Sequence, residues 1–147
     1  AFLAQRVDGH KKVMMHRDFQ SQNIMIMSDH VYLIDYQGAR LGSYCYDLAS
    51  LVWDPYVELN PKVALELAHY YYEIAEVSIT FEKFHAHFIE ASLQRVMQAC
   101  GAYCFLSDTK GKSDFKRHLE PGLRTLAVLL KQYDGLHALK ELLNIED

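Results

Sequence analysis

Two carboxylates and one side-chain amide lie close together near the start of the chain. Asn23 follows Asp18 by five residues, and Asp35 follows Asn23 by twelve. A carboxylate can take the proton of an attacking hydroxyl group, and carboxylate and amide oxygens are good ligands for Mg²⁺. Transfer of a phosphoryl group to a hydroxyl needs both kinds of group, so this spacing indicates phosphoryl-transfer chemistry.

The segment between Asn23 and Asp35 can bring these side chains together. Residues 24–27 and 31–34 are short apolar runs, and the turn-forming residues 28–30 separate them, which predicts a β-hairpin. Each strand of about four residues spans roughly 13 Å at about 3.3 Å per residue, so the second strand returns the chain to its starting point. We therefore expect Asp35 to lie beside Asn23.

The loop that contains Asp18 has a known pattern. Residues 16–23, HRDFQSQN, fit the sequence H-R-D-x-x-x-x-N of kinase catalytic loops. Taken singly, Asp18 could cap a turn and Asn23 could bond its own loop. The combination of this loop, an apolar hairpin and Asp35 at its end favours the catalytic interpretation.

The same residues carry a resemblance to a known family. The runs HRDFQSQNIM and LIDYQGARLGSYCYDLASL resemble the aminoglycoside phosphotransferase and choline kinase superfamily. More closely, they resemble its bacterial amino-sugar kinases that act on N-acetylmuramate and N-acetylglucosamine. The resemblance is good over residues 14–54 and looser over the helical remainder. It implies that Asp18 is the catalytic base and that Asn23 and Asp35 are Mg²⁺ ligands. The expected phosphoryl donor is ATP, with GTP as the alternative.

Two further residues are expected to support the loop. His16 is expected to brace it by hydrogen bonds rather than to move protons. Asp47 has the residue type of an N-cap for a helix over residues 48–53. The kinase resemblance implies that Asp47 also binds the backbone of the catalytic loop.

The sequence evidence for an acceptor pocket is weaker than that for the catalytic loop. Trp53, Asp54 and Tyr56 could line it, because aromatic faces and a carboxylate suit a sugar. The alternative is that Trp53 packs in the core and that Asp54-Pro55 forms a turn.

The rest of the chain has the hydrophobic periodicity of helices. Asn60-Pro61 is a strong helix start, and Thr80 can cap a long helix. Helices are expected near residues 1–9, 60–77, 80–106, 113–134 (bent or restarted near Pro121 and Gly122) and 136–144, with a loop over residues 10–23. The expected fold is mainly α with a small β-hairpin (α+β), and residues 1–147 would form the C-terminal, catalytic and acceptor-binding lobe of a protein-kinase-like fold. Because a two-stranded hairpin is unstable alone, we expect it to lie on the helices.

Composition narrows the partners and the compartment. The net charge is −4 and the 15 Lys and Arg residues are scattered, so no nucleic acid is expected to bind. No apolar stretch reaches the roughly 18 residues of a membrane span, and no signal peptide is recognisable, so no membrane partner is expected. The odd count of three cysteines fits a reducing, cytoplasmic environment.

The expected partners are a small-molecule acceptor and a nucleotide. Only about 15 residues precede the catalytic loop, and they lack the glycine-rich loop and lysine that hold the ATP phosphates. The N-terminal nucleotide-binding lobe is therefore expected to be absent from this chain. The chain would then be inactive by itself and could self-associate through apolar surface that the missing lobe would cover.

Three functions compete at this point. The first is an ATP-dependent phosphotransferase, a small-molecule kinase that uses Mg²⁺ and acts on a hydroxyl of a sugar, amino sugar or aminoglycoside-like acceptor. The second is a non-catalytic, pseudokinase-like binding module, which the intact Asp18, Asn23 and Asp35 disfavour. The third is a protein kinase, which Tyr36-Gln37 in place of Phe-Gly disfavours.

Overall fold

The computed structural model describes residues 2–111 and 113–145, which form a mostly helical molecule with two small antiparallel sheets. The helices are α1 (Phe2–Asp8), α2 (Tyr46–Val52), α3 (Pro61–Ile74), α4 (Phe81–Cys104), α5 (Leu119–Leu130) and α6 (His137–Leu142). The strands are β1 (Lys12–Met15), β2 (Ile24–Met27), β3 (His30–Leu33) and β4 (Arg40–Ser43). Short 3₁₀ helices cover Ser21–Asn23 and Ser113–His118, and a π-helix covers Phe105–Thr109. The expected α+β class is confirmed. Within these ranges, no helix has both the length and the apolar content that a bilayer crossing needs.

Two predicted helix starts are confirmed. α3 begins at Pro61, and Oδ1 of Asn60 accepts a hydrogen bond from the backbone N–H of Lys62 over 2.9 Å. α4 begins after Thr80, whose Oγ1 accepts a hydrogen bond from the backbone N–H of Lys83 over 3.4 Å. Such a cap contributes about 1 kcal/mol, so the local sequence is enough to set both boundaries.

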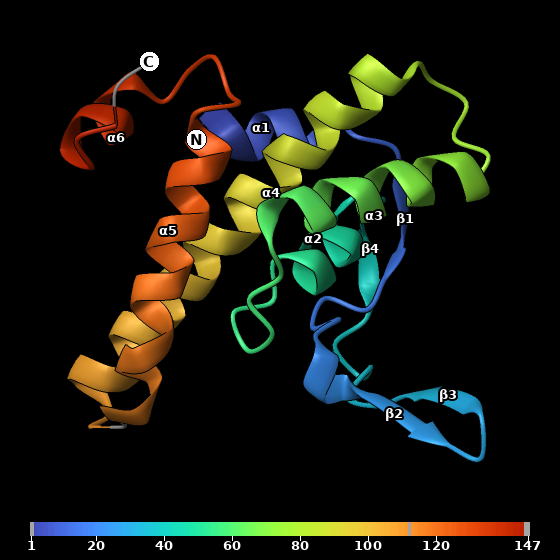
Figure 1. Cartoon of the computed structure of the whole chain (residues 1–147), viewed down its shortest axis with the longest axis horizontal. Coiled ribbons are helices and arrows are strands. Elements are labelled where there is room, and N and C mark those ends of the chain that lie inside the picture. The colour runs from blue at the N-terminus through green and yellow to red at the C-terminus, as the bar shows by residue number, and fades with distance from the viewer. Residues whose placement is uncertain (1, 112, 146–147) are drawn as a thin grey trace.

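The core is built around α4. Its side chains Phe84, Phe88, Ile89 and Leu93 are almost fully buried, and the helix contacts α1, α2, α3 and α5. In Figure 1, α4 runs between α5 on one side and α2 and α3 on the other. Burying a side chain of this size stabilises a fold by about 1.5–3 kcal/mol. The core therefore provides a rigid helix against which the candidate site is built.

The predicted loop over residues 10–23 contains a strand that the sequence did not reveal. β1 pairs with β4 in antiparallel register, with Met15 opposite Arg40 at the end of the ladder. Gly42 allows the close approach, because a Cβ atom at this position would lie 2.4 Å from Sδ of Met15. The strand pair closes the base of the segment 16–39. It therefore brings the start of the catalytic loop close to the residues that follow the hairpin.

The predicted hairpin is confirmed, but it does not lie where it was expected. β2 pairs with β3, with Met27 opposite His30, and Ser28 and Asp29 form the turn with positive φ angles. Figure 1 shows the hairpin projecting away from the helices. All of its apolar side chains except that of Ile24 are exposed, including Ile26 at 76%. The expectation that the hairpin lies on the helices is wrong, because its strands pair only with each other in the described ranges and only its base joins the rest of the molecule.

Candidate active site

The catalytic-loop motif begins directly after β1 and is bonded to Asp47. The Asp47 carboxylate accepts hydrogen bonds from the backbone N–H groups of His16 (2.6 Å) and Arg17 (3.0 Å). The prediction that Asp47 is an N-cap is wrong, because α2 begins at Tyr46 with Cys45 at the N-cap position. The carboxylate faces the loop instead of the N–H groups of its own helix. These two bonds hold Arg17 in a left-handed conformation (φ 77°), which costs about 1–3 kcal/mol when nothing compensates it.

His16 links the loop to the end of the hairpin. Its ring is nearly buried, and Nε2 lies 2.9 Å from the carbonyl oxygen of Ile34. A carbonyl oxygen can only accept, so Nε2 carries the proton and donates it. Nδ1 is buried and has no hydrogen-bond partner among the described residues. The Nε2 bond therefore ties the loop to the residue immediately before Asp35.

Asn23 joins Asp18 to the same end of the hairpin. Its Nδ2 donates a hydrogen bond to the carbonyl oxygen of Asp18 over 2.8 Å. Its own carbonyl oxygen accepts a hydrogen bond from the backbone N–H of Ile34 over 3.1 Å. The residue is buried, so these contacts fix its orientation. Since the amide nitrogen is bonded to the loop, the amide oxygen is the atom of this side chain that can ligate a metal ion.

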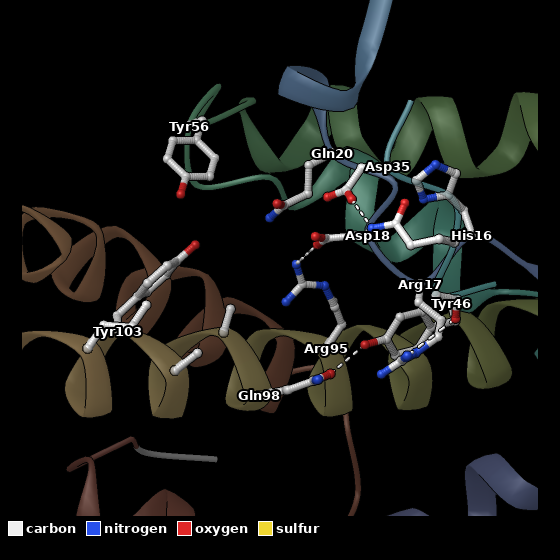
Figure 2. Close-up of a pocket in the computed structure, with 15 residues that line it drawn as sticks. His16, Arg17, Asp18, Gln20, Asp35, Tyr46, Tyr56, Arg95, Gln98 and Tyr103 are labelled. Atoms are coloured by element: carbon white, nitrogen blue, oxygen red, sulfur yellow. Dashed lines mark hydrogen bonds and ion pairs between the residues drawn. The ribbon is translucent and has the colours of Figure 1, made fainter. Parts of the chain in front are cut away.

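Asp35 follows β3 by two residues and has a left-handed backbone conformation (φ 64°). Its carboxylate accepts a hydrogen bond from the side-chain amide of Gln37. Asp18 and Asp35 line one cavity, and Figure 2 shows their carboxylates side by side at its edge. The hairpin therefore brings the two acids together across the intervening sequence.

Asn23 and Asp35 carry oxygen donors of the kind that a hard divalent cation prefers, but Asp35 lines the cavity and Asn23 does not. Mg²⁺ prefers oxygen ligands and takes only one or two from a protein when nucleotide phosphates and water supply the rest. Over residues 2–111 and 113–145, no three His, Cys, Asp or Glu side chains are grouped so that they could hold a metal ion.

The cavity beside Asp18 and Asp35 has a volume of about 410 Å³ and lies between the catalytic loop and α4. This volume falls in the range of small-molecule sites, about 300–1,000 Å³. α4 contributes polar and aromatic side chains to the far wall, including Gln98 and Tyr103. Figure 2 shows Tyr56 on the wall of the cavity that faces Tyr103. Such a lining can contact the hydroxyls and the faces of a sugar.

Two of the cavity tyrosines stay protonated. The Tyr46 hydroxyl donates a hydrogen bond to Oε1 of Gln98. Burial raises the pKa of Tyr46, and it raises the pKa of Tyr103 as well. Both hydroxyls are therefore neutral near pH 7; the Tyr46 proton is already donated to Gln98, whereas the Tyr103 hydroxyl can donate a hydrogen bond to a ligand.

Arg95 lies in the cavity wall and was not predicted from the sequence. Its side chain is 11% exposed, Nε donates a hydrogen bond to Oγ of Ser50 over 3.0 Å, and Nη2 lies 3.9 Å from Oδ1 of Asp18. Figure 2 shows it reaching from α4 toward Asp18. The only sequence signal is that Arg95 and Gln98 share one face of a long helix. The spacing of Arg95 and Gln98 points to a site only when it is known which face of α4 packs against the catalytic loop.

The three residues proposed for the acceptor pocket separate in the structure. Trp53 is buried in the core, and its indole N–H donates a hydrogen bond to Ser92 over 2.9 Å. Asp54 is also buried and accepts hydrogen bonds from the backbone N–H of Ser21 (2.7 Å) and of Tyr56 (3.0 Å). Of the three, only Tyr56 lines the cavity beside Asp18. The structure does not bring Trp53 and Asp54 into this cavity.

The cavity is lined by residues of the catalytic-loop motif, among them Asp18, and by Asp35, which follows the hairpin. Residues 1–80 match the family model described as the phosphotransferase enzyme family (APH). The chain belongs to this family.

Three curated relatives carry the same name, N-acetylmuramate/N-acetylglucosamine kinase. The protein of Neisseria meningitidis serogroup B is 30% identical over 137 residues, which cover 90% of this chain and 41% of the relative. The protein of Pseudomonas aeruginosa is 26% identical over 137 residues, covering 90% of this chain and 40% of the relative. The protein of Pseudomonas putida is 28% identical over 107 residues, covering 69% of this chain and 31% of the relative. The chain thus spans about two fifths of the length of the first two relatives.

Proposed function

We propose that the full-length protein is an ATP-dependent small-molecule kinase in which Asp18 is the catalytic base. One observation carries the proposal: Asp18 and Asp35 share a cavity, while Asn23 is bonded both to Asp18 and to the residue before Asp35. Membership of a phosphotransferase family supports the same function.

In the proposed reaction, Asp18 takes the proton of an acceptor hydroxyl. The hydroxyl oxygen forms a bond to the γ-phosphorus of ATP, and the bond between that phosphorus and the β–γ bridging oxygen breaks, so ADP leaves. Asn23 and Asp35 would hold Mg²⁺, which neutralises the charge of the phosphate oxygens when bound. His16 and Asp47 would keep the loop in place through the hydrogen bonds described above.

The acceptor we propose is a sugar or an amino sugar. The tyrosine rings and neutral hydroxyls around the cavity suit a ring that carries many hydroxyl groups. The names of the three relatives support an N-acetylated amino sugar as the first acceptor to try. Tyr56 stays among the proposed acceptor contacts, and Trp53 and Asp54 are assigned to support of the fold.

We propose that residues 1–147 form the C-terminal lobe of a protein-kinase-like fold and that a separate N-terminal lobe holds the nucleotide. The chain spans about two fifths of the relatives it matches, which leaves room for such a lobe in the full-length protein. The isolated chain should then bind ATP weakly and transfer no phosphate. Titration calorimetry with ATP and Mg²⁺ tests this directly, and micromolar affinity would contradict it.

The exposed apolar hairpin is the surface we propose for the N-terminal lobe in the full-length protein. Met25 and Tyr32 on one face, and Ile26 and Val31 on the other, are each about half exposed or more. In the isolated chain this apolar surface should cause self-association. Sedimentation of the wild type at rising concentration should therefore show oligomers, and Ile26→Lys should reduce them. A monomer at all concentrations would contradict the proposal.

The proposed compartment is the cytoplasm, with no nucleic-acid or membrane partner.

Substitution of Asp18 in the full-length protein tests the proposed function. Asp18→Ala should lower phosphoryl transfer to sugars and amino sugars by roughly 10²–10⁴-fold, the usual contribution of a general base. Asp134→Asn, which changes an exposed carboxylate outside the cavity, is the matched control and should leave transfer unchanged. Unchanged turnover in Asp18→Ala would remove Asp18 from its role. Nucleotide binding without transfer to any acceptor would favour the non-catalytic binding module instead.

A further inference from the structure

We propose that Arg95 binds the acceptor hydroxyl at the point of phosphoryl transfer, in the space between its guanidinium group and the carboxylate of Asp18. This inference rests on the proposed function, because it assigns a partner to the proposed base. It gives α4 a direct part in the reaction.

The Arg95 side chain is held in a defined orientation. Its Nε donates a hydrogen bond to Oγ of Ser50 over 3.0 Å, and Ser50 lies in α2 and is 2% exposed. The same two helices are joined by the hydrogen bond from the Tyr46 hydroxyl to Gln98. The Nε bond fixes one edge of the planar guanidinium, so its Nη groups are directed at the cavity and not free to rotate into solvent.

The distance between Arg95 and Asp18 suits an inserted hydroxyl. At 3.9 Å, Nη2 and Oδ1 are too far apart for a direct hydrogen bond. A hydroxyl oxygen that is hydrogen-bonded to both atoms at about 2.7–2.9 Å can bridge any separation up to about 5.6 Å, so here it would lie beside the line that joins Nη2 and Oδ1. The oxygen would accept a hydrogen bond from Nη2 and donate its own proton to the carboxylate. That is the orientation that a hydroxyl must have before Asp18 removes its proton.

Arg95 is better placed for this contact than Arg17, the second arginine in the cavity lining. Nη1 of Arg17 donates a hydrogen bond to the carbonyl oxygen of Gly38 over 3.3 Å, which directs this guanidinium toward the segment after Asp35. Figure 2 shows the two guanidinium groups pointing in different directions, with only Arg95 reaching Asp18.

Kinetics of the full-length protein test the inference. Arg95→Met should lower kcat/KM for the acceptor by roughly 10²–10³-fold, the usual loss when one preorganised donor is removed from a reacting centre. The KM for ATP should stay within about twofold, because the contact is with the acceptor. Added guanidinium ion should restore part of the activity of Arg95→Met, and a role limited to packing would not respond to it. Arg124→Met is the matched control, since Arg124 pairs with Glu58 and Glu120 outside the cavity and its loss should leave both KM values unchanged.

The outcomes separate this inference from the proposed function. If Asp18→Ala is inactive while Arg95→Met keeps the wild-type acceptor kcat/KM, the inference fails and the proposed function stands. If Asp18→Ala keeps full turnover, the proposed function fails. If Arg95→Met does not fold, Ser50→Ala tests the inference instead. This substitution removes the hydrogen bond that orients the Arg95 guanidinium. It should lower kcat/KM for the acceptor several-fold and leave the KM for ATP unchanged. An unchanged acceptor kcat/KM in Ser50→Ala would overturn the inference.

Discussion

The side-chain nitrogen of Asn23 donates a hydrogen bond to the carbonyl oxygen of Asp18 over 2.8 Å. One buried amide therefore joins the residue proposed to hold the metal to the residue proposed to take the proton. A change at Asn23 should affect the backbone of the catalytic loop as well as metal binding.

Asn23→Asp separates these two effects. An aspartate keeps an oxygen ligand, but when ionised it cannot donate to the Asp18 carbonyl and brings a negative charge beside it. We expect a loss of about 1–3 kcal/mol in the free energy of unfolding, measured by urea denaturation of this chain. In the full-length protein, kcat should fall while the requirement for Mg²⁺ changes less. A urea midpoint equal to that of the wild type would show that the bond does not stabilise the loop.

Asp47→Ala should loosen the start of the catalytic loop. The substitution leaves the N–H groups of His16 and Arg17 without their acceptor, and each such loss costs about 1–3 kcal/mol when the donor is buried. Asp47→Asn keeps one acceptor oxygen and should lose less. The midpoint temperature of thermal unfolding should be highest for the wild type, lower for Asp47→Asn and lowest for Asp47→Ala. Equal midpoints for all three proteins would contradict the assigned hydrogen bonds.

Gly42→Ala should strain the β1–β4 ladder. Its new Cβ would lie 2.4 Å from the end of the Met15 side chain, which is nearly buried, so Met15 must move. We expect a loss of about 1–3 kcal/mol, typical of overpacking. Adding Met15→Ala to this variant removes the clash, so the double substitution should cost less than the two single costs added together. Additive costs would mean that the two side chains do not meet.

The sequence predicts the helices better than the strands that hold the site. Asn60 and Thr80 mark helix starts through short-range hydrogen bonds, which can be identified from a few consecutive residues. β1 and β4 have four residues each, no clear alternation and partners far apart in the chain, so their pairing has no local signal. The sequence predicts the hairpin because its two apolar runs are adjacent. It does not predict that the hairpin is exposed, because burial depends on which other parts of the protein pack against it.

The candidate site, too, can be predicted from the sequence only where its residues are close together in the chain. The types and spacing of Asp18, Asn23 and Asp35 can be recognised as a motif, because one short segment supplies all three. Arg95 lies far from them in sequence and reaches Asp18 only through the packing of α4. Trp53 was a reasonable candidate by residue type, but its ring faces the core and not the cavity.

Stability should fall as the pH is lowered from about 7.5 to about 5. Burial lowers the pKa of His85, and burial together with the nearby His10 lowers the pKa of His87. The folded protein then resists protonation that the unfolded chain accepts near pH 6.5, so acid favours unfolding in this window. Asp8 and Glu82 have lowered pKa values, so the stability they provide is lost only at more acidic pH. Urea midpoints at several pH values should show a slope that His87→Gln reduces, and a flat profile for the wild type would contradict the assignment.

Binding of Mn²⁺ in place of Mg²⁺ tests the central claim most directly, measured by electron paramagnetic resonance on the full-length protein with ADP. If the loop and the residue after the hairpin form one phosphotransfer site, Asn23→Ala and Asp35→Ala should each weaken Mn²⁺ binding by about tenfold or more. Asp18→Asn should bind the ion nearly as the wild type does and still transfer no phosphate. Wild-type Mn²⁺ affinity in both Asn23→Ala and Asp35→Ala would contradict the account.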